Sequence, residues 1–138
     1  MSNPLAYGTL EQMLSAWSAS RFAAVLPEVN LSGMNLDVVP VADERFGDYQ
    51  CNAAMGIAKR AKKSPLDVAK LFVAGAELPP AIERLEIAGP GFINFHLKTE
   101  WLAGHLERVQ ADERLGTPQV GQGRTIVLDY SSPNIAKP

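Results

Sequence analysis

A dense group of polar side chains lies at the C-terminal end of the sequence, directly after the apolar pair Val127–Leu128. Within ten residues the chain presents one carboxylate, two serine hydroxyls, one side-chain amide and one lysine: Asp129, Ser131, Ser132, Asn134 and Lys137. Carboxylate and hydroxyl oxygens accept hydrogen bonds, and amide and ammonium groups donate them, so such a set can bind a small polar ligand. The pattern predicts part of a ligand site in a loop that follows a strand.

A second candidate site is the pair Phe92 and Asn94, which share one face of a predicted strand. If the alternating residues Ile93 and Phe95 face the core, an aromatic ring and an amide stand together on the other face. These two groups can bind an unpaired RNA base, because the ring stacks on the base and the amide reads its edge. The alternative, a partly covered aromatic beside a polar neighbour, is the simpler interpretation of these two residues alone.

The densest basic cluster consists of Lys59, Arg60, Lys62 and Lys63, at the end of a predicted helix. Basic side chains in the last turn of a helix interact favourably with its macrodipole, which is a structural role. The same residues could contact RNA phosphates. The structural role is the favoured interpretation, and the two roles are compatible.

Other chemistry-bearing residues are isolated. Gly89-Pro90-Gly91 lacks the glycine spacing, the lysine and the following helix of a phosphate loop, so a tight turn is expected. His96 and His105 have no carboxylate or cysteine pattern near them, and we expect ordinary surface or core roles. Two histidines and the single Cys51 do not make a zinc set, and no disulfide can form within the chain.

Length and composition fit one domain. The chain has 138 residues, of which 46% are hydrophobic and 20% charged, enough to bury a core without disulfides or metal. The net charge of -2 argues against a general nucleic-acid binder but allows a local RNA contact. The N-terminus lacks a signal-peptide pattern and no apolar run could span a bilayer, so we expect a cytoplasmic protein with no membrane partner.

Helices must position these residues, and their start signals are clear. Thr9 and Gln12 form a capping-box pattern before a helix that Pro27 ends. Gly47, near Asp48, is expected to open a second helix that runs to the basic cluster. Ser64, a following proline and an acidic residue predict a third helix, and a last helix is expected with Thr99 as its cap.

Strands are expected at 36–41, 85–87 and 92–97, the first at a sheet edge because Pro40 cannot donate to a ladder. The fold class is therefore α+β, a small antiparallel sheet packed against several helices. We expect this domain to cover residues 1–122. A separate strand at 125–129 would begin a second, truncated unit covering residues 123–138.

Three stretches resemble segments of arginyl-tRNA synthetases. Asp129–Pro138 is similar to the loop that enters the catalytic site of that family, after the first strand of a Rossmann-type domain and before the HIGH-type ATP signature. Arg45–Ala54 looks like the family's Phe-Gly-Asp-Tyr-Gln helix start, and Ala88–Phe95 resembles its Gly-Pro-Gly hairpin. The matches occur in order, and they identify the chain as the N-terminal piece of such an enzyme.

The resemblance implies an arginine–tRNA ligase that joins arginine to ATP as an adenylate and then transfers it to tRNA(Arg). Asp129 would supply negative charge for the cationic substrate, and Lys137 would face an ATP phosphate. Three side chains would hydrogen-bond the amino acid: Ser131, Ser132 and Asn134. ATP with Mg would be a substrate of the whole enzyme, whereas this piece would bind no cofactor, hold no catalytic residue and be inactive alone. A monomer is expected.

The resemblance also implies that the N-terminal domain contacts the tRNA elbow at an exposed D-loop nucleotide. Phe92 would stack on that nucleotide and Asn94 would hydrogen-bond it, with phosphate contacts from Lys59, Arg60, Lys62 and Lys63. Two alternatives are a free-standing RNA-binding module and a protein-interaction domain whose Gly-Pro-Gly hairpin binds a partner.

Overall fold

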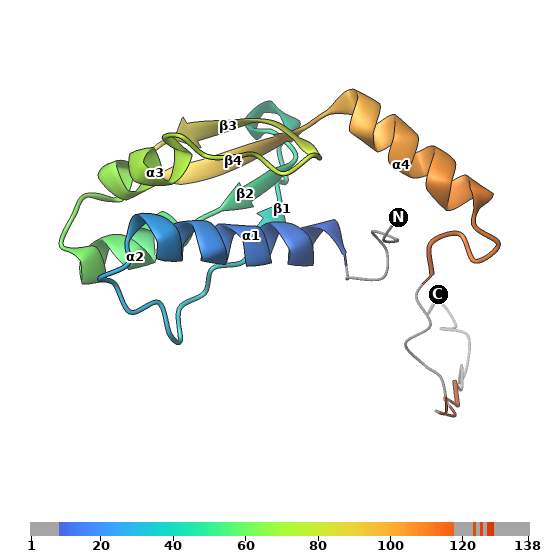
Figure 1. Ribbon diagram of the computed structural model, residues 1–138, viewed down its shortest axis with the longest axis horizontal. Coiled ribbons are helices and arrows are strands. Elements are labelled where there is room, and N and C mark those ends of the chain that lie inside the picture. The colour runs from blue at the N-terminus through green and yellow to red at the C-terminus, as the bar shows by residue number, and fades with distance from the viewer. Residues whose placement is uncertain (1–8, 118–122, 124, 126, 129–138) are drawn as a thin grey trace, which may run out of the picture.

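The computed structural model describes residues 9–117, 123, 125, 127 and 128. Within this part the α+β prediction is confirmed, with helices packed on one side of a four-stranded antiparallel sheet. The helices α1, α2 and α3 pack together against the sheet, whereas α4 extends from the end of β4 and away from them (Figure 1). The elements in chain order are α1 Leu10–Val25, β1 Val38–Pro40, η2 Glu44–Phe46, β2 Tyr49–Cys51, α2 Ala53–Ala61, α3 Pro65–Val73, β3 Ile82–Ala88, β4 Phe92–Leu97 and α4 Thr99–Ala111.

Helix α1 begins as the sequence predicts. The Thr9 hydroxyl accepts a hydrogen bond from the Gln12 backbone N–H, and the Gln12 side chain accepts one from the Thr9 N–H. Its buried side chains recur every four residues, at Leu14, Ser18 and Phe22, which places them on one face of the helix. That face packs on the sheet and on α3.

The predicted start of α3 is also confirmed. The Ser64 hydroxyl accepts a hydrogen bond from the Asp67 N–H, and Pro65 occupies the first turn, where its missing N–H leaves no helical bond unmade. At the other end of α3, the Arg21 guanidinium of α1 donates hydrogen bonds to the carbonyls of Phe72 and Ala74. These bonds satisfy carbonyls that the helix end leaves unpaired.

The sheet has the strand order β1-β2-β4-β3, so β4 lies in its interior and β1 at one edge. The edge position of Pro40 is therefore confirmed. Strand β3 is longer than the predicted strand 85–87, and its pairing with β4 shifts register between Ile82 and Arg84.

The prediction that a helix opens at Gly47 is wrong. A short 3-10 turn, η2, ends just before Gly47, β2 follows it, and α2 begins only at Ala53. Gly47 and Asp48 resemble local helix signals, but here they form long-range contacts with β4. The Asp48 N–H donates to the Phe95 carbonyl (2.9 Å), and the Asp48 carboxylate accepts from the Leu97 N–H (2.8 Å). Non-local pairing therefore overrides the local signal.

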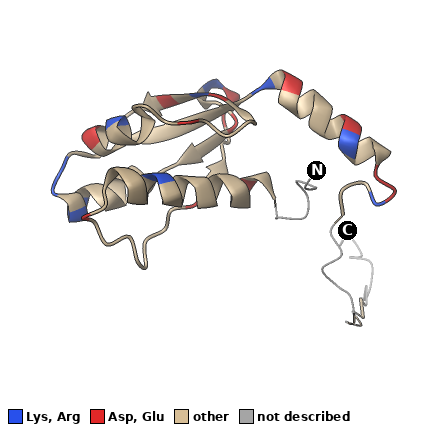
Figure 2. Cartoon of the chain, viewed as in Figure 1, with Lys and Arg blue, Asp and Glu red and all other residues tan. Residues whose placement is uncertain are grey.

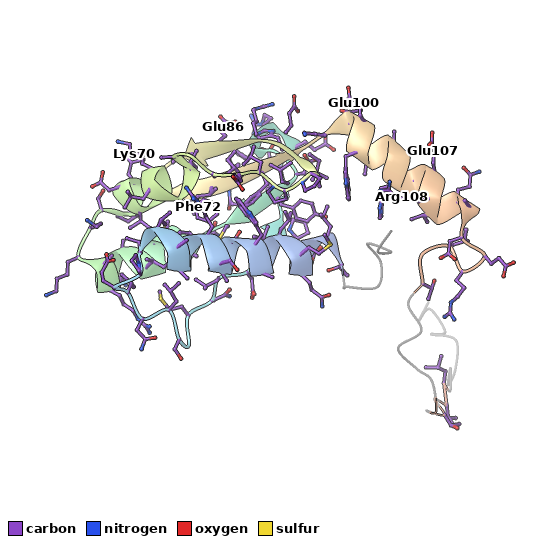
Figure 3. The ribbon with its side chains drawn as sticks, in the orientation of Figure 1. Lys70, Phe72, Glu86, Glu100, Glu107 and Arg108 are labelled. Atoms are coloured by element: carbon purple, nitrogen blue, oxygen red, sulfur yellow. The ribbon has the colours of Figure 1, made fainter. Side chains whose placement is uncertain are left out.

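The core lies between the sheet and α1, α2 and α3, and is built around aromatic rings. Phe72 contacts Phe22 at a centroid distance of 4.4 Å and Trp17 edge-on at 5.4 Å. Trp17 reaches across to Phe95 of β4 at 6.2 Å. Figure 3 shows Phe72 pointing from α3 towards α1, while Lys70 of the same helix lies at its outer side. Such pairs contribute about 0.5–1.5 kcal/mol each beyond the area they bury.

Helix α4 differs from the other helices, since none of its residues is buried. The predicted Thr99 cap is wrong: Lys98 is the N-cap, without a side-chain cap bond, and Thr99 is the first helical residue. Leu102 and Leu106 are exposed along the helix. Of the predicted strand 125–129, the described residues Thr125, Val127 and Leu128 are not in a strand, so the domain boundary and the Rossmann-type start stay predictions.

Candidate nucleic-acid interface

The face of the sheet that points away from the helices carries the Phe92–Asn94 pair. Ile93 and Phe95 are fully buried in the core, as predicted, but burial does not alternate along β4, because Asn94 between them is buried as well. The register aligns Asn94 with Gln50 of β2 on one side and with Glu86 of β3 on the other, and aligns Gln50 with Val39 of β1. We call these four side chains, Val39, Gln50, Asn94 and Glu86, the outer row.

Phe92 is half-buried at the start of β4 and pairs with Ala88 across the β3–β4 hairpin. Its ring lies beside Gly89, since a Cβ atom built on that glycine would come within 3.3 Å of a ring carbon. Among the described residues, Phe92 is in no aromatic pair of the kind that holds Phe72 in the core. The ring is therefore packed at its edge and still partly open to solvent.

Asn94 corrects the expectation of an open amide. Its side chain is only 1% exposed, because it lies in an interior strand between the longer side chains of Gln50 and Glu86. Gln50 Nε2 donates a hydrogen bond to Asn94 Oδ1 at 2.8 Å. The RNA role of Asn94 stays a prediction, but this residue forms the floor of the outer face.

His96 and His105 are placed in different surroundings. His96 Nε2 lies 3.1 Å from a Glu86 carboxylate oxygen, so the structure brings to it a carboxylate from the neighbouring strand. Figure 3 labels Glu86 on β3, on the sheet and away from α1. His105 stacks on Trp101 within α4 at a centroid distance of 5.0 Å. Neither histidine is part of a catalytic arrangement among the described residues.

The basic cluster divides into structural and free members. The Arg60 guanidinium donates hydrogen bonds to the carbonyls of Asn30 and Ser32, which fixes the loop after α1. Lys62 caps α2 in the left-handed conformation, with φ 53°. Lys59, Lys62 and Lys63 are exposed, and Figure 2 shows the connection between α2 and α3 in blue. The macrodipole interpretation thus suits Lys59 and Arg60, which lie in the last turn.

The β3–β4 hairpin meets the start of α3 at Gly91. A Cβ atom on Gly91 would lie 2.8 Å from the Pro65 carbonyl oxygen, and its φ of +146° suits glycine. This close approach seats the start of β4 on the start of α3, two residues after Lys63. Lys63 and Lys70 also line a surface hollow of about 380 Å³ on α3. The structure therefore places Gly91, the residue before Phe92, against Pro65, which follows the predicted phosphate-binding segment by two residues.

The predicted arginine-binding and ATP-binding residues, Asp129, Ser131, Ser132, Asn134 and Lys137, lie outside the described residues. Within the described part of the chain, no group of His, Cys, Asp or Glu side chains could hold a metal ion. In that part, no helix is long and apolar enough to cross a membrane. Cys51 is buried in the core as a free thiol, and burial raises its pKa to about 11, so the thiol stays protonated near neutral pH.

Gln50 is the residue of this face that the sequence reasoning missed. A helix that opens at Gly47 would include Tyr49–Cys51, and this interpretation hides the alternation of an inward Cys51 and an outward Gln50. The one available signal was the Tyr-Gln-Cys alternation itself, which is too short to indicate a strand without its partners.

The fold and this face define a small α+β domain with an aromatic and amide surface beside an exposed basic segment. Residues 10–97 match the family model described as the arginyl tRNA synthetase N terminal domain. That range covers more than half of the chain and includes the whole sheet. The chain therefore belongs to the arginyl-tRNA synthetase family, and carries its N-terminal domain.

Individual relatives agree. The chain is 41% identical over 127 residues to the arginine–tRNA ligase of Cellvibrio japonicus, a match that covers 92% of this chain and 21% of the relative. It is 51% identical over 92 residues to that of Pseudoalteromonas atlantica, covering 67% of this chain and 16% of the relative. The chain thus spans about a fifth of the length of the curated relatives that it matches.

Solved structures share the fold. The arginyl-tRNA synthetase of Plasmodium falciparum superposes with a TM-score of 0.60 at 18% identity, over 72% of this chain and 18% of that one. The Thermus thermophilus arginyl-tRNA synthetase gives a TM-score of 0.51 at 24% identity, over 73% of this chain and 16% of that one. At these identities the likeness concerns the fold alone.

Proposed function

We propose that this chain is the tRNA-contacting N-terminal part of an arginine–tRNA ligase, and that the outer face of its sheet binds an unpaired nucleotide at the tRNA elbow. The observation that carries the proposal is the position of Phe92. Its half-open ring lies at the start of β4, and the neighbouring Gly91 packs on Pro65, beside the exposed lysines of the α2–α3 connection.

The chemistry of this arrangement fits single-stranded RNA. A base stacks on an aromatic face whatever its identity, and lysines on an adjacent loop attract the phosphates that flank it. Lys59, Lys62 and Lys63 supply positive charge on a chain whose net charge is -2. The contact is therefore local to this end of the domain.

In the same proposal, the segment after the domain belongs to the catalytic part of the enzyme. Asp129, Ser131, Ser132 and Asn134 would bind arginine, and Lys137 would face ATP phosphate. The resemblance of Asp129–Pro138 to the family's loop supports these roles. The ligase activity, with arginine, ATP and tRNA(Arg) as substrates, is likewise proposed for the whole enzyme on the strength of the relatives named as arginine–tRNA ligases.

The test is a titration of the chain with a tRNA(Arg) transcript. Stacking on an aromatic ring contributes roughly 1–3 kcal/mol per base by alanine substitution, so Phe92→Ala should weaken binding about tenfold or more. Phe92→Tyr keeps the ring and should retain most of the affinity.

Phe46→Ala is the matched control. Phe46 is a 45% exposed aromatic residue in η2. It precedes Gly47, which lies beside His96, towards the end of β4 away from Phe92. Its removal should leave tRNA affinity unchanged. Equal affinities of the Phe92→Ala and Phe46→Ala variants would contradict the proposed site.

A further inference from the structure

We propose that Gln50 is a positioning residue for RNA recognition: it fixes the amide of Asn94 so that the outer face presents a hydrogen-bond donor to a nucleobase. This inference rests on the proposed function and deepens it. It names the group that would meet the base and the residue that orients it.

The orientation follows from one hydrogen bond. Gln50 Nε2 donates to Asn94 Oδ1, so the carbonyl end of the Asn94 amide points towards β2. A neutral amide carries its acceptor and its donors at opposite ends. With the oxygen held by Gln50, the Nδ2 end is turned away from β2.

The Nδ2 group is unpaired, on a side chain that is only 1% exposed. It makes no hydrogen bond within the described part of the chain. In that part, the fully enclosed side-chain atoms that lack a hydrogen-bond partner are Ser18 Oγ and His105 Nδ1, and Asn94 Nδ2 is not one of them. Glu86, on the other side of Asn94, pairs instead with His96. Across the outer row, Asn94 is thus anchored on one side only.

The ligand chemistry follows from this arrangement. A base stacked on Phe92 lies two residues along the same strand face, about 7 Å from Asn94 in Cα spacing. The edge of this base that faces Asn94 meets the Nδ2–H donor. That edge must therefore carry an acceptor, either a ring nitrogen or a carbonyl oxygen. Because Asn94 is almost fully buried, Gln50 determines which end of its amide faces the base.

A double-mutant cycle in tRNA affinity tests the inference. One neutral hydrogen bond contributes roughly 0.5–1.5 kcal/mol, about two- to twelvefold in Kd. Gln50→Leu frees the Asn94 amide to turn, so it should weaken binding of the tRNA(Arg) transcript about threefold or more. In the Asn94→Ala background, Gln50→Leu should have no further effect. Thermal melts of each variant accompany the titrations.

A charge-matched pair gives the second measurement. Glutamate at position 50 has only acceptors, so in Gln50→Glu the Asn94 amide must turn its donor inward and present its oxygen. Val39→Glu adds the same charge to the outer row, at an exposed position next to Gln50, without reaching Asn94. Gln50→Glu should weaken tRNA binding about threefold or more beyond Val39→Glu.

The outcomes separate the two proposals. Equal costs of Gln50→Leu with and without Asn94, or equal affinities of Gln50→Glu and Val39→Glu, would overturn the positioning role while Phe92→Ala still weakens binding. If Phe92→Ala and Asn94→Ala both bind tRNA like the unmodified chain, the RNA site itself is wrong and this inference falls with it. A Gln50→Leu effect confined to the melting temperature would also overturn the inference.

Discussion

Gly47 should be among the least replaceable residues of the domain, because it combines backbone strain with a close contact. Its φ is +95°, and an added Cβ atom would lie 2.8 Å from the Phe95 carbonyl oxygen and 3.2 Å from the His96 ring. That carbonyl already accepts the Asp48 N–H, so any shift also disturbs the pairing of β2 with β4. Gly47→Ala should therefore destabilise the fold through two separate costs.

The magnitude can be estimated from a control glycine. Gly75 also has a positive φ, +63°, but nothing lies within 4 Å of its added Cβ atom. Gly75→Ala should show only the conformational cost, about 1–2 kcal/mol. Gly47 lies at φ 95° and ψ -159°, a region that is essentially confined to glycine and costs other residues about 1–3 kcal/mol, and Gly47→Ala adds an overpacking cost of about 1–3 kcal/mol, for a total of roughly 2–6 kcal/mol.

Urea and thermal denaturation of both variants measure the difference. In a domain of this size, 1 kcal/mol corresponds to a shift in Tm of about 4–8 °C, so Gly47→Ala should melt roughly 10 °C or more below the unmodified chain. If Gly47→Ala proves no more destabilising than Gly75→Ala, the backbone contact with Phe95 does not constrain the fold, and the reasoning fails.

Two further predictions concern pH and capping. Burial raises the pKa of the Cys51 thiol from 9.0 to about 11, so the folded state favours the neutral thiol. The free energy of unfolding that this preference contributes is fully present below pH 9 and is lost as the pH rises to 11. In urea titrations across that window, the free energy of unfolding of the unmodified chain should fall by up to roughly 3 kcal/mol more than that of Cys51→Ala. If the two chains show the same dependence on pH, the pKa of Cys51 is not raised. Ser64→Ala removes the cap on the Asp67 N–H and should cost about 1 kcal/mol in the same assay, whereas Ser20→Ala on the exposed side of α1 should not destabilise the domain.

Local signals predicted those elements whose stabilising contacts are themselves local. The caps at Thr9 and Ser64 act on N–H groups three residues away, so sequence spacing is sufficient to identify them. The turn at Gly89–Gly91 is local in the same sense.

The errors lie where distant contacts decide the structure. Asp48 resembles a helix signal, but its carboxylate accepts a hydrogen bond from the N–H of Leu97, 49 residues away. The burial of Asn94 depends on Gln50 and Glu86, which flank it only once the sheet is assembled. The sequence therefore predicts a pair of side chains on one strand, whereas the neighbouring Gln50 is placed beside them only by the pairing of β2 with β4.

The strand order also bears on how the domain folds. Ile87 pairs with Ile93 only six residues away, whereas Gln50 pairs with Asn94 across 44 residues. Loop-closure entropy makes the longer pairing more costly by about 2 kcal/mol, so we expect the β3–β4 hairpin to form before β2 docks on it. The hydrogen bond from Gln50 to Asn94 is then among the last contacts to form. The proposed RNA surface is therefore complete only in chains that have finished folding.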